Sequence, residues 1–155
     1  MNRRVFLKGA VACGAFASSA SLLLTPSVAS AADAWPKATM DLTTEKEVLE
    51  ALNMSGATET EMKVKAPQIA ENGATVPVEV DASKLPGQVK RIAVLVAGNP
   101  RPLAAVFHYN EGSVGLLGTR VKMGKTGNLS FVVETDKGVF IKTQEIKVTI
   151  GGCGG

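Results

Sequence analysis

Between residues 61 and 150 the sequence repeats one pattern, in which short runs of apolar residues are bounded by turn-forming residues. Val76, Val78 and Val80 occupy every second position, as in a strand with one buried face. Residues 92–97 are apolar throughout, which is typical of a central strand covered on both faces. This regular spacing predicts a mainly β fold, an immunoglobulin-like antiparallel β-sandwich. The predicted strands cover residues 61–66, 76–80, 92–97, 103–109, 116–122, 129–134 and 139–150.

Three details of these runs give finer predictions. Pro77 has no backbone N–H to donate, so its strand should lie at a sheet edge or contain a bulge. The apolar side chains at the odd positions of residues 103–109 should share one face of their strand. In the last run the apolar side chains change from odd positions, such as Val139, to even positions, such as Ile146. This change of phase predicts a bulge or bend near Thr143-Gln144.

A short helix is predicted before the first strand. Thr44 can cap its N-terminus, because Glu47 stands three residues later in the spacing of a capping box. An apolar stripe begins at Val48 and lies opposite charged residues, so one face of the helix should be buried. We expect the helix to end near Ser55-Gly56 and residues 32–41 to form an irregular lead-in.

Residues 1–31 have the features of a twin-arginine signal peptide, an export leader that is removed after use. Arg3 and Arg4 precede Val-Phe-Leu-Lys, an apolar stretch covers residues 9–24, and Ala-Ser-Ala at residues 29–31 forms a small-residue processing site. The alternative is a buried N-terminal helix, which would leave a charged head and uncapped ends without partners. We therefore expect export to the periplasm.

Removal of the leader leaves residues 32–150 as one predicted β-sandwich domain with a tail at residues 151–155. The precursor has 17 basic and 14 acidic residues. Because Arg3, Arg4 and Lys8 lie in the leader, the mature chain has 14 of each and no net charge. Its charge therefore indicates no nucleic-acid or membrane-surface partner. No apolar stretch reaches the roughly 20 residues of a membrane span.

Cys153 is the only cysteine outside the leader, because the other one, Cys13, lies within it. Lipid attachment at Cys13 is the weaker alternative, since the residues before it lack the usual leucine. A single cysteine in an oxidising compartment cannot form an internal disulfide. Cys153 must therefore be free, modified or bonded to another molecule.

The tail surrounds Cys153 with Gly151, Gly152, Gly154 and Gly155. Glycine loses the most entropy on ordering and offers no side chain to pack, so the tail should be mobile and exposed. Its length places the sulfur roughly 10 Å beyond the last strand. A thiol held in this way can enter a narrow active site on another protein. We interpret the tail as a swinging arm, and the alternative is an unstructured terminus with an incidental cysteine.

The residues around Cys153 favour a passive carrier over an enzyme. No cationic side chain or histidine lies near it in the tail, so its pKa should stay near the ordinary value of about 8.5. His108 is the only histidine and falls in a predicted strand, and one histidine with one cysteine cannot form a zinc site alone. The sequence contains no P-loop or dinucleotide motif. We predict no catalytic residue, metal site or cofactor.

Together these features resemble the SoxY family, the sulfur-substrate carriers of bacterial thiosulfate-oxidising systems. The resemblance rests on the twin-arginine leader, on Ala-Pro-Gln-Ile-Ala-Glu-Asn-Gly-Ala-Thr-Val-Pro-Val at residues 66–78, and on the tail at residues 151–155. It implies that Cys153 is the attachment point for sulfur intermediates.

The resemblance also implies partners. A SoxZ-like β-sandwich subunit without its own leader would form a heterodimer with this chain and be exported with it. A haem cytochrome would couple thiosulfate oxidatively to Cys153, and a hydrolase would then release sulfate. A sulfur dehydrogenase would oxidise the remaining persulfide, so that Cys153 is recycled.

Two other functions compete with this interpretation. An exported adhesion or structural module could use Cys153 for an intermolecular disulfide. A ubiquitin-like carrier could be activated at the carboxylate of Gly155, but that chemistry needs ATP, which an exported protein would not meet. The early helix followed only by strands also fits a ubiquitin-like fold poorly.

Overall fold

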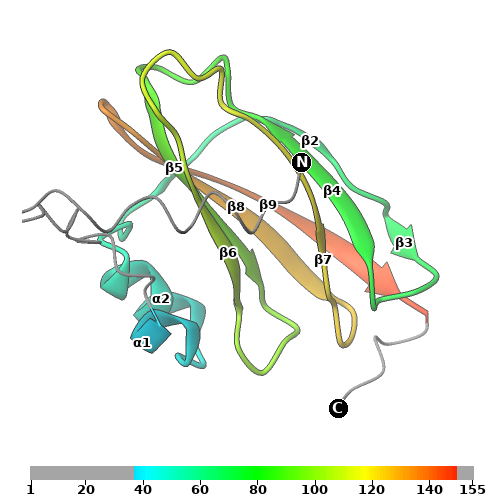
Figure 1. The fold of residues 1–155 in the computed structure, drawn as a ribbon. Helices are drawn as coiled ribbons and strands as arrows, with labels where there is room; N and C mark the ends of the chain where they lie inside the picture. Colours follow the sequence, from blue (N-terminus) through cyan, green and yellow to red (C-terminus); the bar gives the residue numbers. More distant parts are fainter. Residues whose placement is uncertain (1–36, 150–155) are drawn as a thin grey trace, which may run out of the picture. The chain divides into compact units, whose positions relative to one another are not determined.

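Strands arranged in two sheets dominate the described part of the chain, which is residues 37–149 of the computed structural model (Figure 1). The helices are α1 (Lys37–Met40) and α2 (Glu45–Ala51), and the strands are β1 (Thr58–Glu59), β2 (Lys63–Lys65), β3 (Ile69–Ala70), β4 (Val76–Asp81), β5 (Val89–Val96), β6 (Leu103–His108), β7 (Leu116–Val121), β8 (Gly127–Thr135) and β9 (Gly138–Val148). The larger sheet has the order β1-β9-β8-β5-β6, with β3 also pairing with β9, and the smaller has the order β2-β4-β7. This architecture confirms the predicted β-sandwich with a short N-terminal helix.

Branched aliphatic side chains fill the space between the two sheets. Val76, Val78 and Val80 of β4 are buried, while the residues between them are exposed, so the predicted one-sided burial is confirmed. They belong to one cluster with Ile92 of β5 and Phe131 of β8. The stretch from Ile92 to Val96 is buried throughout, because β5 lies between β6 and β8 and both of its faces are covered.

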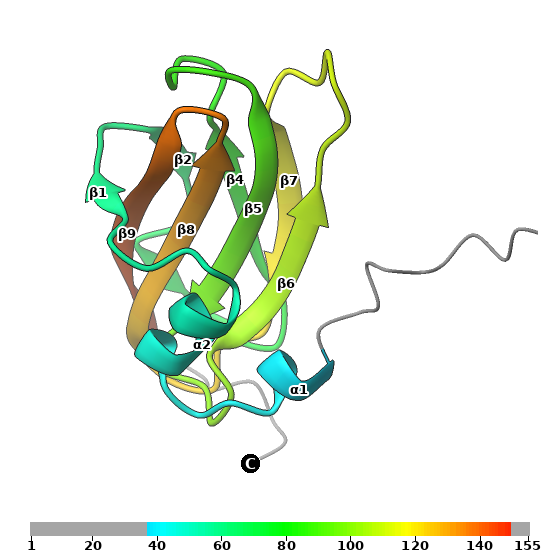
Figure 2. The same ribbon diagram turned by 90° about the vertical axis from the view of Figure 1, so that its left-hand side faces the viewer.

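The helical segment covers the other face of the larger sheet (Figure 2). Val48 and Leu52 pack with Leu95 of β5 and Val132 of β8 in a second cluster of buried residues. The larger sheet is therefore buried on both sides, by the smaller sheet and by the helices. Neither helix described here is long and apolar enough to cross a bilayer.

The start of α2 is as predicted, but its end and the segment before it differ. Thr44 is the N-cap, and its hydroxyl oxygen accepts from the backbone N–H of Glu47 at 3.3 Å. The helix ends at Ala51 instead of near Ser55, because Asn53 adopts a left-handed backbone with φ of 57°. The prediction that residues 32–41 are irregular is wrong at Lys37–Met40, which forms α1.

The predicted bulge near Thr143 is wrong. β9 pairs with β8 in one continuous antiparallel register, from Gly138 opposite Thr135 to Ile146 opposite Gly127. The apolar pattern changes phase because the two halves of β9 contact different layers. Val139 and Ile141 pack in the helix-side cluster, whereas Ile146 and Val148 pack between the sheets.

A bulge occurs instead where β6 begins. The register between β5 and β6 shifts at Val94 and Leu95, so that Leu103 packs on the helix side. Phe107 and Tyr109 pack between the sheets, and the prediction of a single face for residues 103–109 is therefore wrong for Leu103. The prediction for Pro77 holds locally, because Pro77 is paired only with β7 while the pairing of β4 with β2 ends at Glu79.

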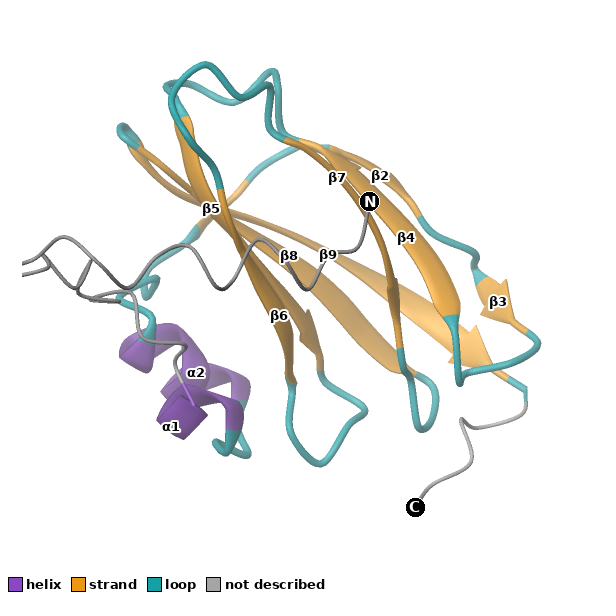
Figure 3. Cartoon of the chain, viewed as in Figure 1, coloured by secondary structure: helices purple, strands orange, loops and turns teal. Residues whose placement is uncertain are grey.

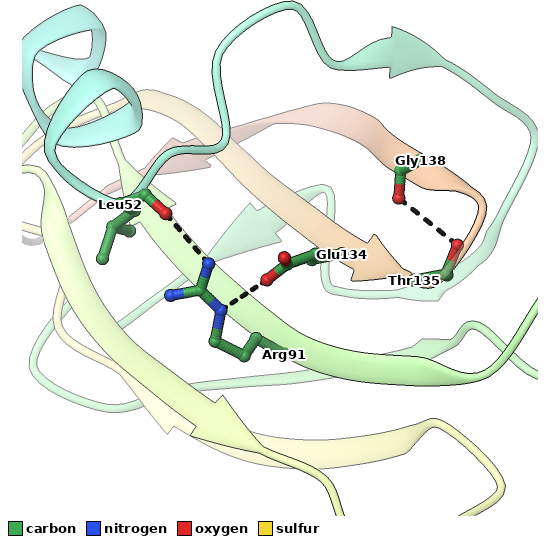
Figure 4. Close-up of polar contacts among 5 residues, drawn as sticks. All are labelled: Leu52, Arg91, Glu134, Thr135 and Gly138. Carbon is green, nitrogen blue, oxygen red and sulfur yellow. Dashed lines mark hydrogen bonds and ion pairs between the residues drawn. The ribbon is translucent and has the colours of Figure 1, made fainter. Parts of the chain in front are cut away.

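Arg91 of β5 ties the end of α2 to the sheet (Figure 4). Its Nη2 donates to the carbonyl of Leu52 at 2.9 Å, and its Nε donates to the carboxylate of Glu134 on β8. The side chains of Arg91 and Glu134 are 24% and 25% exposed. Nearby, the hydroxyl of Thr135 donates to the carbonyl of Gly138 and closes the turn between β8 and β9.

Replacing Arg91 should loosen the helical layer. We expect Arg91→Met to lower the free energy of unfolding by about 1–3 kcal/mol, because the half-buried Glu134 and the Leu52 carbonyl lose their partner. Chemical denaturation of the purified protein measures the change. Arg101→Met is the matched control, since its ion pair with Asp41 is exposed and should contribute less than about 1 kcal/mol. Equal losses of unfolding free energy in the two variants would show that Arg91 does not stabilise the contact between α2 and the sheet.

Candidate functional site

The residues that the sequence analysis assigns to the arm lie outside the described part of the chain. These are Cys153 and the tail glycines, namely Gly151, Gly152, Gly154 and Gly155. The leader at residues 1–31 also lies outside it. The structure does describe the residues that precede the tail, which are Val148 at the end of β9 and Thr149 directly after it. We call these two residues and their hydrogen-bonding partners the tail root.

On one side of the tail root, β3 holds the end of β9. The two strands run parallel, with Ile69 opposite Lys147 and Ala70 opposite Val148. The backbone N–H of Lys147 donates to the carbonyl of Gln68 at 2.9 Å. Past the end of the strand, the backbone N–H of Thr149 donates to the carbonyl of Ala70 at 3.1 Å.

The side chain of Thr149 adds a further contact on the same side. Its hydroxyl donates to the carbonyl of Glu71 at 3.2 Å, across 78 positions of sequence. Glu71, like all of β3, belongs to residues 66–78, the stretch on which the resemblance to the SoxY family partly rests. Backbone carbonyls of this stretch therefore accept the hydrogen bonds that hold the residues directly before the tail.

On the other side, the loop between β7 and β8 reaches the tail root. The hydroxyl oxygen of Thr126 accepts from the backbone N–H of Val148 at 2.9 Å. The side chain of Asn99 holds this loop by two bonds, donating to the carbonyl of Lys122 at 2.7 Å and accepting from the N–H of Gly124 at 2.9 Å. The loop is thus fixed independently of its contact with β9.

Close backbone packing supports the same loop. A Cβ on Gly127 would lie 3.0 Å from the backbone nitrogen of Gly98, so a larger residue at position 127 would push the two segments apart. The backbone N–H of Met123 donates to the carbonyl of Gly73 at 2.7 Å. The loops that follow β3, β5 and β7 therefore meet at the end of the sandwich where β9 finishes (Figure 3).

A shallow groove runs beside the tail root, along the edge of β9 between its contacts with β1 and β3. Ile69 stands at this groove with 58% of its surface exposed. The remaining lining is mixed in polarity. The groove residues are Val64, Ala66, Gln68, Ile69, Gln144, Glu145 and Lys147.

The ionisable groups with shifted pKa values have local structural causes. The backbone N–H of Gln88 lowers the pKa of Asp136 by hydrogen bonding to its carboxylate, and the hydroxyl and N–H of Ser83 lower the pKa of Asp81. Asp81 is the last residue of β4 and Asp136 lies in the turn between β8 and β9. His108 is exposed at the end of β6. Within residues 37–149, no group of three or more His, Cys, Asp or Glu could hold a metal ion.

Sequence reasoning missed the tail root entirely. β1 and β3 are strands of two residues each that pair in parallel with β9, and no alternating pattern marks such short segments. The hydroxyls of Thr126 and Thr149 stand in stretches that look like ordinary turn and strand ends. The available signal was the stretch at residues 66–78, which resembles the SoxY family without an evident role in the core.

Comparisons with known proteins agree with this geometry. A family model described as "Sulfur oxidation protein SoxY" matches residues 46–153. The sulfur carrier protein SoxY from Chlorobium limicola f thiosulfatophilum has a similar structure, with 34% sequence identity and a TM-score of 0.54, over 65% of this chain and 93% of that chain. No curated protein gives a significant match. Because the family model covers most of the sequence, this chain belongs to the SoxY family.

Proposed function

We propose that this chain carries sulfur intermediates covalently on Cys153 and presents them to separate enzymes in the periplasm. Membership of the SoxY family gives the chain a carrier role in sulfur oxidation. The observation that carries the finer proposal is the extent of the family match, which runs to Cys153 itself. The matched segment thus includes the only cysteine beyond the predicted leader.

The tail root supports an arm with a fixed origin. Cys153 is four residues beyond Thr149, which is the last described residue and is hydrogen-bonded to the domain. Four extended residues span about 13–14 Å, which limits the sulfur to a small volume around the end of the sandwich. Tethering within such a volume gives a high effective concentration once a partner enzyme has docked. A glycine-rich tail can meanwhile adapt to the shape of each active site.

The chemistry on Cys153 balances with named partners. When thiosulfate joins the cysteine, a new S–S bond forms, the thiol loses its proton, and a haem cytochrome accepts two electrons. Water then attacks the terminal sulfonate group under catalysis by a hydrolase, so that the outer S–S bond breaks, sulfate leaves and a persulfide remains. A sulfur dehydrogenase oxidises that outer sulfur to a sulfonate, with three water molecules supplying the oxygen atoms and six electrons passing to a haem cytochrome. Hydrolysis of the remaining S–S bond then releases a second sulfate and returns Cys153 as the thiol. The carrier itself supplies no acid, base or redox group to these steps.

Export and assembly complete the proposal. The leader at residues 1–31 supports twin-arginine transport, a route that moves folded proteins. A SoxZ-like β-sandwich subunit without a leader would be exported as a heterodimer with this chain. Both the compartment and the subunit are inferred from the sequence and the family resemblance.

Removing the sulfur atom should abolish function without affecting the fold. We expect Cys153→Ser to unfold at the same temperature as the parent, because it changes one atom and leaves the buried core within residues 37–149 unaltered. We also expect it to show no sulfur-substrate turnover with the partner enzymes. Intact-mass analysis under non-reducing conditions should find thiosulfate or sulfur adducts on the parent chain alone. Exclusive disulfide dimer in the parent would support the structural-module alternative, and turnover by the serine variant would refute the carrier role.

Stiffening the arm should slow delivery. Proline fixes its own φ and restricts the residue before it, so we expect Gly152→Pro to reduce turnover by about tenfold, since a misplacement of about 1 Å can cost up to 100-fold. Gly152→Ala is the control, because it adds one methyl group and leaves the backbone largely free. Steady-state rates with the partner enzymes measure both variants. Equal rates for parent and proline variant would mean that tail flexibility is irrelevant.

Replacing the paired arginines should block export. We expect Arg3→Lys combined with Arg4→Lys to leave the chain in the cytoplasm with its leader attached. Cell fractionation and the mass of the chain measure the outcome, and Lys8→Arg serves as a control that keeps the charge of the leader. Processed double variant in the periplasm would contradict the twin-arginine assignment.

A further inference from the structure

The hydrogen-bonded order of β9 extends beyond the end of its neighbour. The pairing of β9 with β8 ends at Ile146, opposite Gly127, the first residue of β8. Val148 and Thr149 nevertheless remain hydrogen-bonded on both sides of the strand. Something other than the β8 ladder must therefore hold them.

Two threonine hydroxyls take over from the ladder. On the β8 side, Thr126 Oγ1 occupies the place of the missing backbone acceptor and receives the N–H of Val148 at 2.9 Å. On the β3 side, Thr149 adds its hydroxyl bond to Glu71 at 3.2 Å beside the backbone bond to Ala70 at 3.1 Å. Val148 and Thr149 are thereby held from two directions.

We propose that Thr126 and Thr149 are positioning residues that form a clamp and set the point where the carrier arm begins. This inference rests on the proposed function of Cys153. Both threonines are exposed, and water could satisfy their hydroxyls, so neither bond is needed to avoid a buried unpaired group. The core residue of this region, Ile146, is fully buried within the apolar cluster between the two sheets. The clamp therefore acts on the tail and not on the packing of the domain.

Opening the clamp would lengthen the arm. With the clamp closed, Cys153 follows Thr149, the last described residue that is hydrogen-bonded, by four positions. Without the two hydroxyls, Thr149 keeps only its backbone bond to Ala70, and once that bond also opens Cys153 follows Lys147 by six positions. Effective concentration falls roughly as the −3/2 power of tether length, which gives a loss of about twofold from length alone. An arm whose first residues are less firmly held also loses its defined starting direction, so we expect a loss of about twofold or more.

The test uses the full chain carrying Cys13→Ser, so that Cys153 is its single thiol. Thr126→Val and Thr149→Val remove one hydroxyl each with little change of shape, and a third chain carries both changes. Thr126→Ser and Thr149→Ser keep the hydroxyl and should behave like the parent. Thr143→Val is the matched control. Thr143 lies in β9 away from the tail root, and its hydroxyl is hydrogen-bonded at 2.9 Å to the hydroxyl of Ser130 in β8.

Three measurements separate the positioning of the arm from the intrinsic reactivity of the Cys153 thiol. Amide hydrogen exchange by NMR should quicken about three- to tenfold at Val148 in Thr126→Val. It should quicken at position 149 in Thr149→Val, because the side-chain bond to Glu71 is lost. Single-turnover delivery to saturating partner enzyme should fall about twofold or more in the double variant. The reaction of Cys153 with a small disulfide reagent should stay unchanged in every variant, because it needs no positioning.

The outcomes decide between the possibilities. Faster exchange with slower delivery in the valine variants, and parent behaviour in the serine and Thr143→Val chains, would establish the clamp. Unchanged exchange would show that the hydroxyls hold nothing, and faster exchange with unchanged delivery would show that the root does not position the arm. Either result overturns the proposal. If the parent itself delivers no sulfur, the function of Cys153 fails instead, while the exchange rates still decide whether the clamp exists.

Discussion

The pairing of β9 with three other strands is the constraint on which the rest of this structure depends. β8 borders one edge of β9 along nearly its whole length, while β1 and β3 cover parts of the other edge in parallel. β8 and β5 lie further inside the same sheet, and β9 pairs with the edge of β8 that β5 does not cover. The same pairings bring order to the last described residues of the chain. Stability of the sandwich and definition of the tail root thus come from one strand.

Much of the fold could be predicted from local pattern. The valines of β4, the continuous apolar run of β5 and the capping residue Thr44 all act within a few residues of sequence, and each was identified. The features that escaped prediction depend on which layer a strand contacts. The phase change of β9 reflects two different neighbours on its two faces, and the position of Leu103 reflects a shifted register with β5.

The candidate site divides in the same way. Cys153 and its glycines are evident in the sequence because their chemistry is a property of the residues themselves. The tail root is formed by backbone carbonyls and by hydroxyls that come together only in the folded chain. Thr149 and Glu71 are far apart in sequence, and neither residue type marks its partner. Non-local hydrogen bonds of this kind leave no periodic signature, so only the structure reveals them.

The place of β9 at the end of the sandwich also affects how the domain is made. Among the described strands β9 is synthesised last, and until it pairs, the buried run from Leu129 to Val133 on β8 forms a bare sheet edge. Unpaired edges of apolar strands are sites of aggregation and proteolysis. A prematurely terminated polypeptide therefore cannot close its sheet, and quality control can remove it. Closure of this sheet edge therefore depends on the strand that directly precedes the segment carrying Cys153.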